Sequence, residues 1–346
     1  MVLSSMAGKG ICSIGNFKLT HYPAAHSLKY GKPMKFRRFA LFFLMAVSLA
    51  GAKKKDRDDT KTQRLPDIKE PPAFAIGDAA HFVFHLSPMS PKGLLSQQTR
   101  EGVTALLKLT GGNNVVHLRA FVAGSGDLRR VPQIVAEVFT RHHQPIPSLS
   151  IAQVGALPME GAQVVFESVS ETRKPVNPAG ITFVAAQDSV EHLAAKTGSA
   201  PPLTVTCLVN DIAKAPELTA ALTAKFPGAV LNVMQSQRLA ARPFTSCEAV
   251  VRGGRTGQYV FTGTQSAFGF EEKDATLAFQ RIGRELTGAG ASPGDVVLTN
   301  VYALTRPIAE MALKARPAGG EYSVLPVEGI AASDGSFAID VVAIRP

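Results

Sequence analysis

The feature that most constrains the fold of this chain is a pattern of strands and helices that occurs three times. In the first copy, apolar alternation and helical spacing predict strand, helix, strand, helix, strand and strand at 81–86, 96–112, 114–124, 127–143, 148–158 and 162–170. The same order is predicted near the C-terminus at 259–265, 271–290, 295–304, 308–314, 321–330 and 336–344. A shorter middle copy is predicted at 180–187, 189–196, 202–210, 216–226, 228–235 and 244–252. This alternation predicts α/β or α+β layers, with helices covering one face of each sheet.

The length of the chain agrees with three domains. With 346 residues, 45% of them apolar, it can bury two or three hydrophobic cores, and we place the domains at 73–172, 176–253 and 255–346. Residues 53–72 are charged and end in Glu-Pro-Pro, a composition typical of a linker. Residues 1–33 lack apolar periodicity and precede a better start at Met34, so we expect that they are not part of the native protein.

The net charge of +10 lies in the N-terminal segment. Residues 1–55 hold ten Lys or Arg and no acidic residue, which leaves 27 basic and 27 acidic residues in 56–346. Because the remainder is formally neutral, composition does not support a phosphate-binding surface, and we expect no nucleic-acid partner.

The segment from Met34 has the layout of a secretory signal peptide. It reads MKFRRFALFFLMAVSLAGAKKK, with a basic start, a short apolar run and small residues near Ala52. We therefore predict a signal peptide at 34–52 and a secreted or periplasmic protein with no membrane attachment after cleavage. An uncleaved membrane anchor is the alternative.

Three segments resemble the Rid family, also known as the YjgF or L-PSP endoribonuclease-like family. QQTREGVTALLKL resembles its first-helix signature, VFTGTQ its strand-and-turn motif near the ligand, and GALPMEGAQVVFES its Leu-Pro turn before the last strand. The resemblance covers residues 74–345 and is faint in the middle copy. It implies an α+β, chorismate mutase-like fold that assembles as a trimer, with sheets inside, helices outside and a ligand cleft at each subunit interface. Three fused copies would close this ring within one chain, so we expect a monomeric pseudo-trimer.

The resemblance also implies where a substrate would bind. In deaminating members, an Arg near the start of the penultimate strand grips the substrate carboxylate with its planar guanidinium. The matching positions hold Leu149 in the first copy and Tyr322 in the third, and fall near Ala229 in the middle copy. All three clefts are therefore predicted to lack this clamp. Gln187 and Gln265 match the end of the family's Ser-Gly-Gln turn, although ordinary turn chemistry at a strand end explains them as well.

The acidic residue of the family's last strand is present in every copy, as Glu167, Glu248 and Asp340. In the family this carboxylate is thought to orient a water or relay a proton, so these three are the candidate catalytic residues. A solvated strand face is the alternative for them. His117 and Arg119 alternate on one face of a strand, where they would either line a cleft or lie on the surface.

Nothing in the sequence indicates a cofactor or a metal. It has no CxxC pair, no Gly-rich phosphate loop and no Gly-x-Ser-x-Gly elbow, so we expect neither. Cys207 and Cys247 lie on two strands of the middle copy. We expect buried thiols there, with a disulfide as the alternative that an oxidising compartment permits.

Three functions remain open. The first is an exported Rid-like protein that binds a small molecule and has lost the carboxylate clamp. The second is an enamine/imine deaminase of the 2-iminobutanoate/2-iminopropanoate type, in which Arg119, Arg238 or Arg242 replaces the clamp. The third, an endoribonuclease, ranks last because the neutral body lacks the basic track that RNA binding requires.

Overall fold

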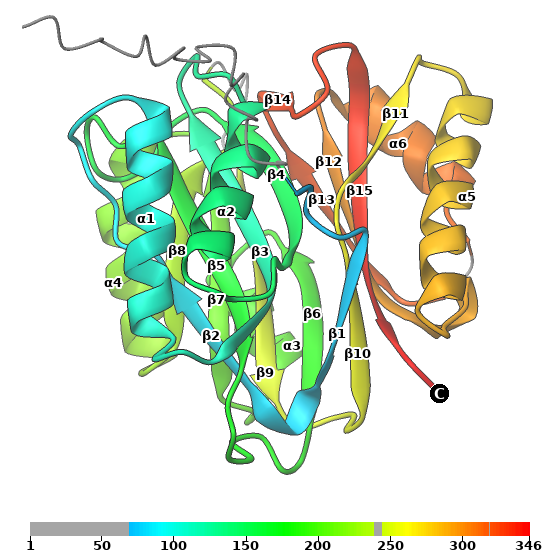
Figure 1. Ribbon diagram of the computed structural model, residues 1–346, viewed down its shortest axis with the longest axis horizontal. Coiled ribbons are helices and arrows are strands. Elements are labelled where there is room, and N and C mark those ends of the chain that lie inside the picture. The colour runs from blue at the N-terminus through cyan, green and yellow to red at the C-terminus, as the bar shows by residue number, and fades with distance from the viewer. Residues whose placement is uncertain (1–68, 239–243, 318) are drawn as a thin grey trace, which may run out of the picture. The chain divides into compact units, whose positions relative to one another are not determined.

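The computed structural model describes residues 69–238, 244–317 and 319–346. The predicted signal peptide, most of the predicted linker, the residues before Met34 and Arg242 lie outside the described residues. None of the helices in the described part of the chain has the length and hydropathy needed to span a bilayer. The prediction of an α+β fold with mixed sheets is confirmed (Figure 1).

The strands form three mixed sheets. The first sheet has the order β14-β4-β3-β5-β2, with β2 (Phe82–Leu86), β3 (Asn114–Ala123), β4 (Ser148–Val154), β5 (Val164–Glu171) and β14 (Gly329–Ile330). The middle sheet has the order β6-β9-β7-β8, with β6 (Ile181–Gln187), β7 (Pro202–Val209), β8 (Val230–Gln235) and β9 (Thr245–Arg252). The third sheet has the order β1-β10-β15-β12-β13, with β1 (Phe74–Asp78), β10 (Gln258–Thr262), β12 (Val296–Ala303), β13 (Glu321–Pro326) and β15 (Gly335–Ile344), and β11 (Gln265–Phe268) also pairs with β15.

Helices connect the strands and cover the sheets. They are α1 (Leu95–Leu109), α2 (Arg130–Arg141), α3 (Val190–Thr197), α4 (Ala215–Lys225), α5 (Glu272–Gly288) and α6 (Arg306–Ala315), with short 3-10 helices at Ala79–His81, Ile212–Lys214 and Pro293–Asp295. In each sheet one parallel pair, β3–β4, β7–β8 or β12–β13, is joined through a helix, because a parallel connection must cross from one end of the sheet to the other. Figure 1 shows α1, α2 and α4 on one side of the strands and α5 and α6 on the opposite side.

Both faces of each sheet are buried. One face packs against helices, and the other packs against the other two sheets. Helices α1 and α2 pack on the first sheet, α3 and α4 on the middle sheet, and α5 and α6 on the third. Two further cores contain side chains from all three sheets, for example Phe121, Leu208 and Tyr302 in one of them. All three sheets turn one face to these shared cores, and the helices cover the other face.

The contacts between sheets run in one direction around this interior. Strand β4 of the first sheet contacts β10 of the third, β13 of the third contacts β6 of the middle sheet, and β8 of the middle sheet contacts β2 of the first. In each sheet the strand that is parallel to its neighbour, β4, β13 or β8, therefore contacts β10, β6 or β2 of another sheet. These last three strands are equivalent, because each pairs antiparallel with β15, β9 or β5 of its own sheet. The series of three contacts closes on itself.

Two short strands of the structure, β1 and β14, differ from the prediction. Phe74–Asp78 forms β1, which pairs with β10 in the third sheet although the next strand, β2, belongs to the first. The predicted strand at 321–330 is broken after Pro326, and Gly329–Ile330 pairs instead with β4 of the first sheet. Each of the two strands pairs with the edge of a sheet whose other strands lie far away in the sequence. A local sequence pattern therefore cannot predict the strand with which either one pairs.

Cys207 and Cys247 form a disulfide between β7 and β9. The expectation of two free thiols is wrong, and the alternative of a disulfide holds. The antiparallel register places the two residues directly opposite each other, with 4.1 Å between their Cα atoms. Directly opposed residues of an antiparallel pair lie close enough for their sulfur atoms to bond.

Candidate functional site

One row of polar residues crosses all three sheets at the same register. In each sheet it joins the parallel strand, the central strand and the last strand: Ser150–Arg119–Glu167, Asn232–Thr206–Glu248 and Ser323–Asn300–Asp340. The neighbours of the acidic residues, such as Phe166 and Ile339, point to the helices, so alternation turns Glu167, Glu248 and Asp340 to the interior. The alternative of a solvated strand face for these carboxylates is wrong.

Arg119 is the centre of this group. Its Nε and NH2 donate to Glu167 Oε2 at 2.8 and 2.7 Å, and its NH1 lies 2.6 Å from Glu248 Oε1. The three side chains retain only 13%, 15% and 9% of their accessible surface, so Arg119 is not a surface residue. Burial alone would lower the pKa of Arg119, but the two carboxylates raise it well above its ordinary value.

The remaining oxygen of Glu167 is bound by the middle sheet. Thr206 Oγ1 and Asn232 Nδ2 donate to Glu167 Oε1 at 2.5 and 2.6 Å. Glu167 therefore accepts hydrogen bonds on both of its oxygens, from side chains of two different sheets. Such a carboxylate is held in place firmly and links the first sheet to the middle one.

Asp340 is bound in the same way between the first and third sheets. Ser150 Oγ and Tyr302 OH donate to its Oδ2 at 2.5 and 2.8 Å, and Asn300 Nδ2 donates to its Oδ1 at 2.8 Å. Burial raises the pKa of Asp340 despite these donors and the nearby Arg119. Burial also raises the pKa of Tyr302 well above its ordinary value, and the Asp340 carboxylate adds to this effect.

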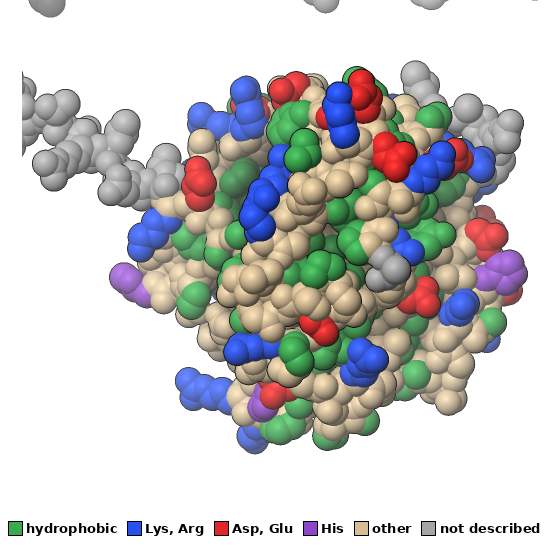
Figure 2. Space-filling model, turned by 90° about the vertical axis from the view of Figure 1, so that its right-hand side faces the viewer, with side chains coloured by type: hydrophobic (Ala, Val, Ile, Leu, Met, Phe, Trp, Pro, Cys, Tyr) green, Lys and Arg blue, Asp and Glu red, His purple; other side chains and the backbone are tan. Residues whose placement is uncertain are grey.

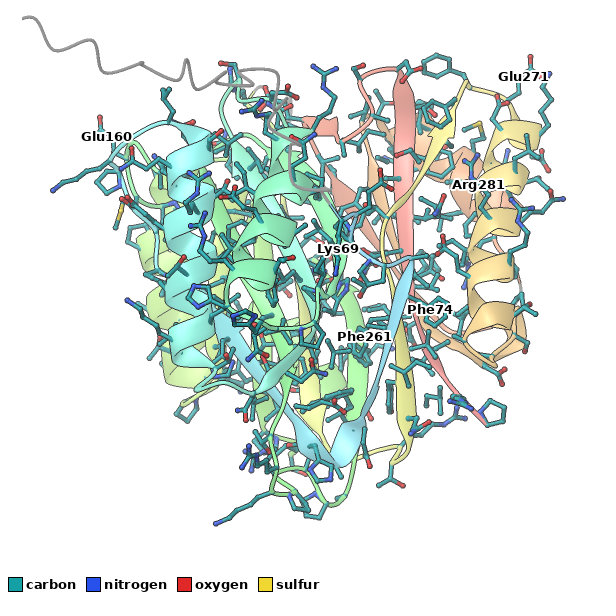
Figure 3. All side chains as sticks on the ribbon, viewed as in Figure 1. Lys69, Phe74, Glu160, Phe261, Glu271 and Arg281 are labelled. Atoms are coloured by element: carbon teal, nitrogen blue, oxygen red, sulfur yellow. A yellow bond between two sulfur atoms is a disulfide. The ribbon has the colours of Figure 1, made fainter. Side chains whose placement is uncertain are left out.

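A cavity of about 70 Å³, which we call the central cavity, lies against this polar row. An apolar layer with the same threefold register also lines it: Phe84 faces Val169, Phe183 faces Val250, and Phe261 faces Val342. Each valine lies two residues along its strand from one of the three carboxylates. His117 also lines it and stacks on Phe261, which lies among the strands in Figure 3, with 5.4 Å between ring centroids. Burial lowers the pKa of His117 to about 3, so its imidazole is neutral at physiological pH.

Leu149 and Gln265 line a second cavity, which we call the β4–β10 cleft. It has a volume of about 500 Å³ and lies between β4 and the turn after β10. The two walls are tied by a hydrogen bond from Thr264 N to Leu149 O at 3.2 Å. The basic side chains that line this cleft are Lys69 and Arg129, and Arg129 is paired with Asp127 at 2.9 Å.

Tyr322 and Gln187 lie on β13 and β6, which contact each other. Tyr322 is 45% exposed, with the Arg316 guanidinium 4.8 Å from its ring centroid. Gln187 Nε2 donates to the main-chain oxygens of Ala185 and Ala186 at 2.8 and 3.1 Å, which fits the alternative of turn chemistry at a strand end.

The predicted site residues therefore do not form one site in the structure. Glu167, Glu248, Asp340 and Arg119 meet at the central cavity, and none of the four lines the β4–β10 cleft. Within the described residues, no group of three or more His, Cys, Asp or Glu is arranged to hold a metal ion.

Sequence reasoning missed the neutral partners of the three carboxylates: Ser150, Thr206, Asn232, Asn300 and Tyr302. A signal was present for Thr206, Asn232 and Asn300, because each places a polar side chain in a strand that is mostly apolar. Buried polar side chains need hydrogen-bond partners, so such a side chain indicates a polar contact inside the protein.

Glu285 on α5 is hydrogen bonded to Gln265, which donates from Nε2 to Glu285 Oε1. Burial raises the pKa of Glu285 from 4.5 to about 7, against the lowering effects of Gln265 and of Arg281 and Arg284. The folded state therefore binds this proton more tightly than the unfolded chain. The stability that this preference contributes is complete below pH 4.5 and is lost as the pH rises through about 7.

We expect Glu285→Gln to remove this pH dependence. Between pH 5 and pH 8 the native chain should lose on the order of 1 kcal/mol more unfolding free energy than the variant, a reduced value because Glu285 is partly exposed. Urea denaturation at the two pH values measures the difference. Glu272→Gln, at an exposed position on the same helix, is the control and should behave as the native chain. Equal pH dependence in all three proteins would contradict the assignment.

Comparisons with known proteins give partial matches. No protein-family model and no curated protein matches the chain. Similar solved structures include Rv2704, a YjgF/YER057c/UK114 family member from Mycobacterium tuberculosis, with 25% identity and a TM-score of 0.23 over 28% of this chain and 82% of that one. TdcF from E. coli with bound serine has 19% identity and a TM-score of 0.22 over 25% and 81%. A chorismatase has 13% identity and a TM-score of 0.43 over 80% and 78%.

Proposed function

We propose that this chain is a single-chain ring of three Rid-like domains, 73–172, 176–253 and 255–346, that binds a small molecule and does not deaminate 2-iminoacids. The observation that carries the proposal is the wall of the β4–β10 cleft. Leu149 and Ile151, both buried, stand there beside Gly263 and Gln265. An aliphatic side chain at position 149 cannot form the paired charged hydrogen bonds that a substrate carboxylate requires.

The ring is supported by the equivalence of the three sheets. Each has a parallel pair, a central strand and an antiparallel last strand, and the polar row crosses each at the same register. The one-way contacts between sheets support this arrangement, because a head-to-tail interface with a threefold rotation would produce them and would close after three steps. The proposed protein is therefore a monomer, because its interfaces are satisfied within the chain.

Two of the three arginines that could replace the clamp, Arg119 and Arg238, are paired with carboxylates, and Arg242 lies outside the described residues. Arg119 is enclosed by Glu167 and Glu248, so a substrate carboxylate would have to displace one of them. Arg238 is half-exposed and pairs with Glu328 at 3.2 Å. The β4–β10 cleft combines aliphatic side chains and the amides of Gln133 and Gln265 with the charged side chains of Lys69, Glu70 and Arg129. Such a lining suits a small ligand that has an apolar part and one or two hydrogen-bonding groups.

We also propose that the protein is exported and acts in the periplasm or outside the cell, without a nucleic-acid partner and without membrane attachment after signal cleavage. The charge balance of residues 56–346 supports the exclusion of nucleic acid. On the face shown in Figure 2, lysine and arginine side chains are interspersed with acidic ones and form no continuous basic track.

The activity test uses 2-aminoacrylate generated in place by a dehydratase. We expect the purified protein to release 2-oxoacid only marginally faster than buffer. Loss of the charged contact costs about 1.5–3 kcal/mol, or a ten- to hundredfold loss in rate, and a substrate that this contact no longer orients loses further acceleration. An active Rid deaminase in a parallel reaction shows that the enamine is present. A large acceleration that Glu167→Ala or Asp340→Ala abolishes would overturn the proposal.

A binding measurement accompanies this assay. A mixture of small metabolites, followed by ligand-observed NMR, should give signals that Leu149→Trp removes, because the larger ring would fill the cleft. Leu109→Trp on α1, where Leu109 is 54% exposed, is the matched control and should keep them. Signals that survive Leu149→Trp would place the ligand outside this cleft.

A further inference from the structure

One polar side chain of the β4–β10 cleft is tied to a helix outside it. Gln265 lies at the start of β11 and lines the cleft, and its Nε2 donates to Glu285 Oε1 on α5. Strand β11 and helix α5 lie side by side in Figure 1. Glu285 itself is not among the residues that line the cleft, so it is placed to act on a ligand there through Gln265.

The Glu285 carboxylate depends on this hydrogen bond. Within the described part of the chain, Gln265 is the donor that binds Glu285 Oε1, whereas Oε2 is buried and has no partner. The nearby Arg281 forms no ion pair with Glu285 and donates instead to the main-chain oxygen of Ser266. Loss of the Gln265 N–H would therefore leave both carboxylate oxygens without a donor, which a buried polar group tolerates poorly.

The same hydrogen bond fixes the direction of the Gln265 amide. An ionised carboxylate only accepts hydrogen bonds, so the NH2 group of Gln265 and not its carbonyl must face Glu285. Rotation of the amide by half a turn would place two acceptors against each other. Gln265 Oε1 has no partner among the described residues and is not one of the buried unpartnered atoms, so it remains accessible as an acceptor.

The rest of the cleft leaves Gln265 as its oriented neutral polar group. Gln133 also lines the cleft, but it is exposed, and nothing in the described residues fixes the direction of its amide. Leu149 and Ile151 are buried and contribute apolar surface. The cleft thus offers an apolar wall together with one hydrogen-bond acceptor of fixed direction, Gln265 Oε1.

We propose that Glu285 is a positioning residue for the β4–β10 cleft, which keeps the Gln265 carbonyl free for the ligand and so makes the cleft select small apolar molecules that carry an N–H or O–H donor. This inference rests on the proposed function, in which the cleft is a binding site. It adds the chemical class of the ligand and the residue that determines it.

The experiment titrates the full chain with indole and with benzoxazole, followed by ligand-observed NMR at pH 8.5, above the pKa of Glu285 of about 7. The two probes have nearly the same shape, but indole donates through its N–H whereas benzoxazole only accepts. We expect indole to bind about fivefold more tightly, because it alone can donate to Gln265 Oε1. Leu149→Trp should remove the binding of both probes, which places them in the cleft.

Three results would overturn the inference: equal binding of the two probes, tighter binding of benzoxazole, or no binding of indole that Leu149→Trp removes. The proposed function is decided separately by the metabolite mixture, because that measurement requires no particular hydrogen-bonding group. A cleft that binds a metabolite but does not prefer indole would leave the proposed function standing and remove the role of Glu285.

Variants of Glu285 separate positioning from a purely structural role. Glu285→Met frees the Gln265 amide to turn its NH2 group to the ligand, so benzoxazole binding should strengthen about threefold while indole binding does not. Glu285→Gln can pair with either end of the amide, so it should also strengthen benzoxazole binding, and it decides the test if Glu285→Met does not fold. Glu272→Met, at an exposed position on the same helix, should keep the native preference.

The dependence on Gln265 is tested by a double-mutant comparison. Gln265→Met should abolish the preference for indole, and adding Glu285→Met to it should change the preference no further, because Glu285 acts through Gln265. A structural role for Glu285 would instead weaken the binding of both probes and leave their ratio unchanged in the single variants. That outcome would contradict the inference.

Discussion

Replacing Arg119 by Met is expected to lower the free energy of unfolding by about 3–5 kcal/mol. Among the residues that the structure describes, Arg119 is the one positive side chain bound to Glu167 and Glu248, and all three side chains are at most 15% exposed. The variant would leave two carboxylates buried beside each other without a counter-charge. Because these residues come from two sheets, the loss should destabilise the interior that the sheets share. Urea denaturation of the native and variant chains measures the difference.

A surface arginine provides the matched control for this variant. Arg100 pairs with Glu137 at 3.2 Å, but both side chains are more than 40% exposed, so Arg100→Met should cost less than about 1 kcal/mol. Adding Glu248→Gln to Arg119→Met should recover part of the lost stability, since it removes one unpaired charge. Similar losses in the two arginine variants would show that the polar row contributes no more than a surface pair.

The ion pairs of Arg119 with Glu167 and Glu248 could be predicted from the sequence only in part. The alternation of His117 and Arg119 with apolar neighbours correctly places the two side chains on one face of a strand. That face is buried because the middle and third sheets cover it, and their strands lie far away in the sequence. A single strand carries no information on which sheet will cover it, so a surface position was an equally good prediction.

The sequence predicts the helices better than it predicts which strands pair with each other. In α1 the apolar spacing of Val103, Leu106 and Leu107 predicts the buried face, and Gly111 with a φ of 60° ends the helix as expected. These signals are local. The pairing of β1 with β10 depends on an edge supplied by residues that follow much later in the chain, so the short apolar run at Phe74 gave no indication of it.

The polar row shows what a comparison of the three copies could have added. Glu167, Glu248 and Asp340 were found because each stands at a matching place in a last strand. The same alignment of the central strands would have matched Arg119 with Thr206 and Asn300, the residues that the register places beside the acids. The residue beside the acid differs between the copies, whereas the acid itself is present in all three. This difference indicates that each copy binds its carboxylate with a different side chain.

Removing the disulfide between Cys207 and Cys247 is the second change that we expect to lower the stability of the protein strongly. Replacing Cys207 and Cys247 together by Ala should lower the free energy of unfolding by about 2–4 kcal/mol. The bond joins residues 40 positions apart, so it restricts the unfolded chain and thereby favours the folded state. Both cysteines are fully buried in the core of α3, α4 and the middle sheet, so the smaller Ala side chains also lose contacts.

Reduction separates the effect of the bond from that of the smaller side chains. Denaturation in the presence of dithiothreitol should lower the stability of the native chain and leave that of the Cys207→Ala, Cys247→Ala variant unchanged, because the variant has no bond to reduce. The proposed mature chain, without residues 1–52, keeps Cys207 and Cys247 as its cysteines, and unfolded without reductant it should expose no reactive thiol. Two reactive thiols in protein isolated from an oxidising compartment would show that β7 and β9 are not linked.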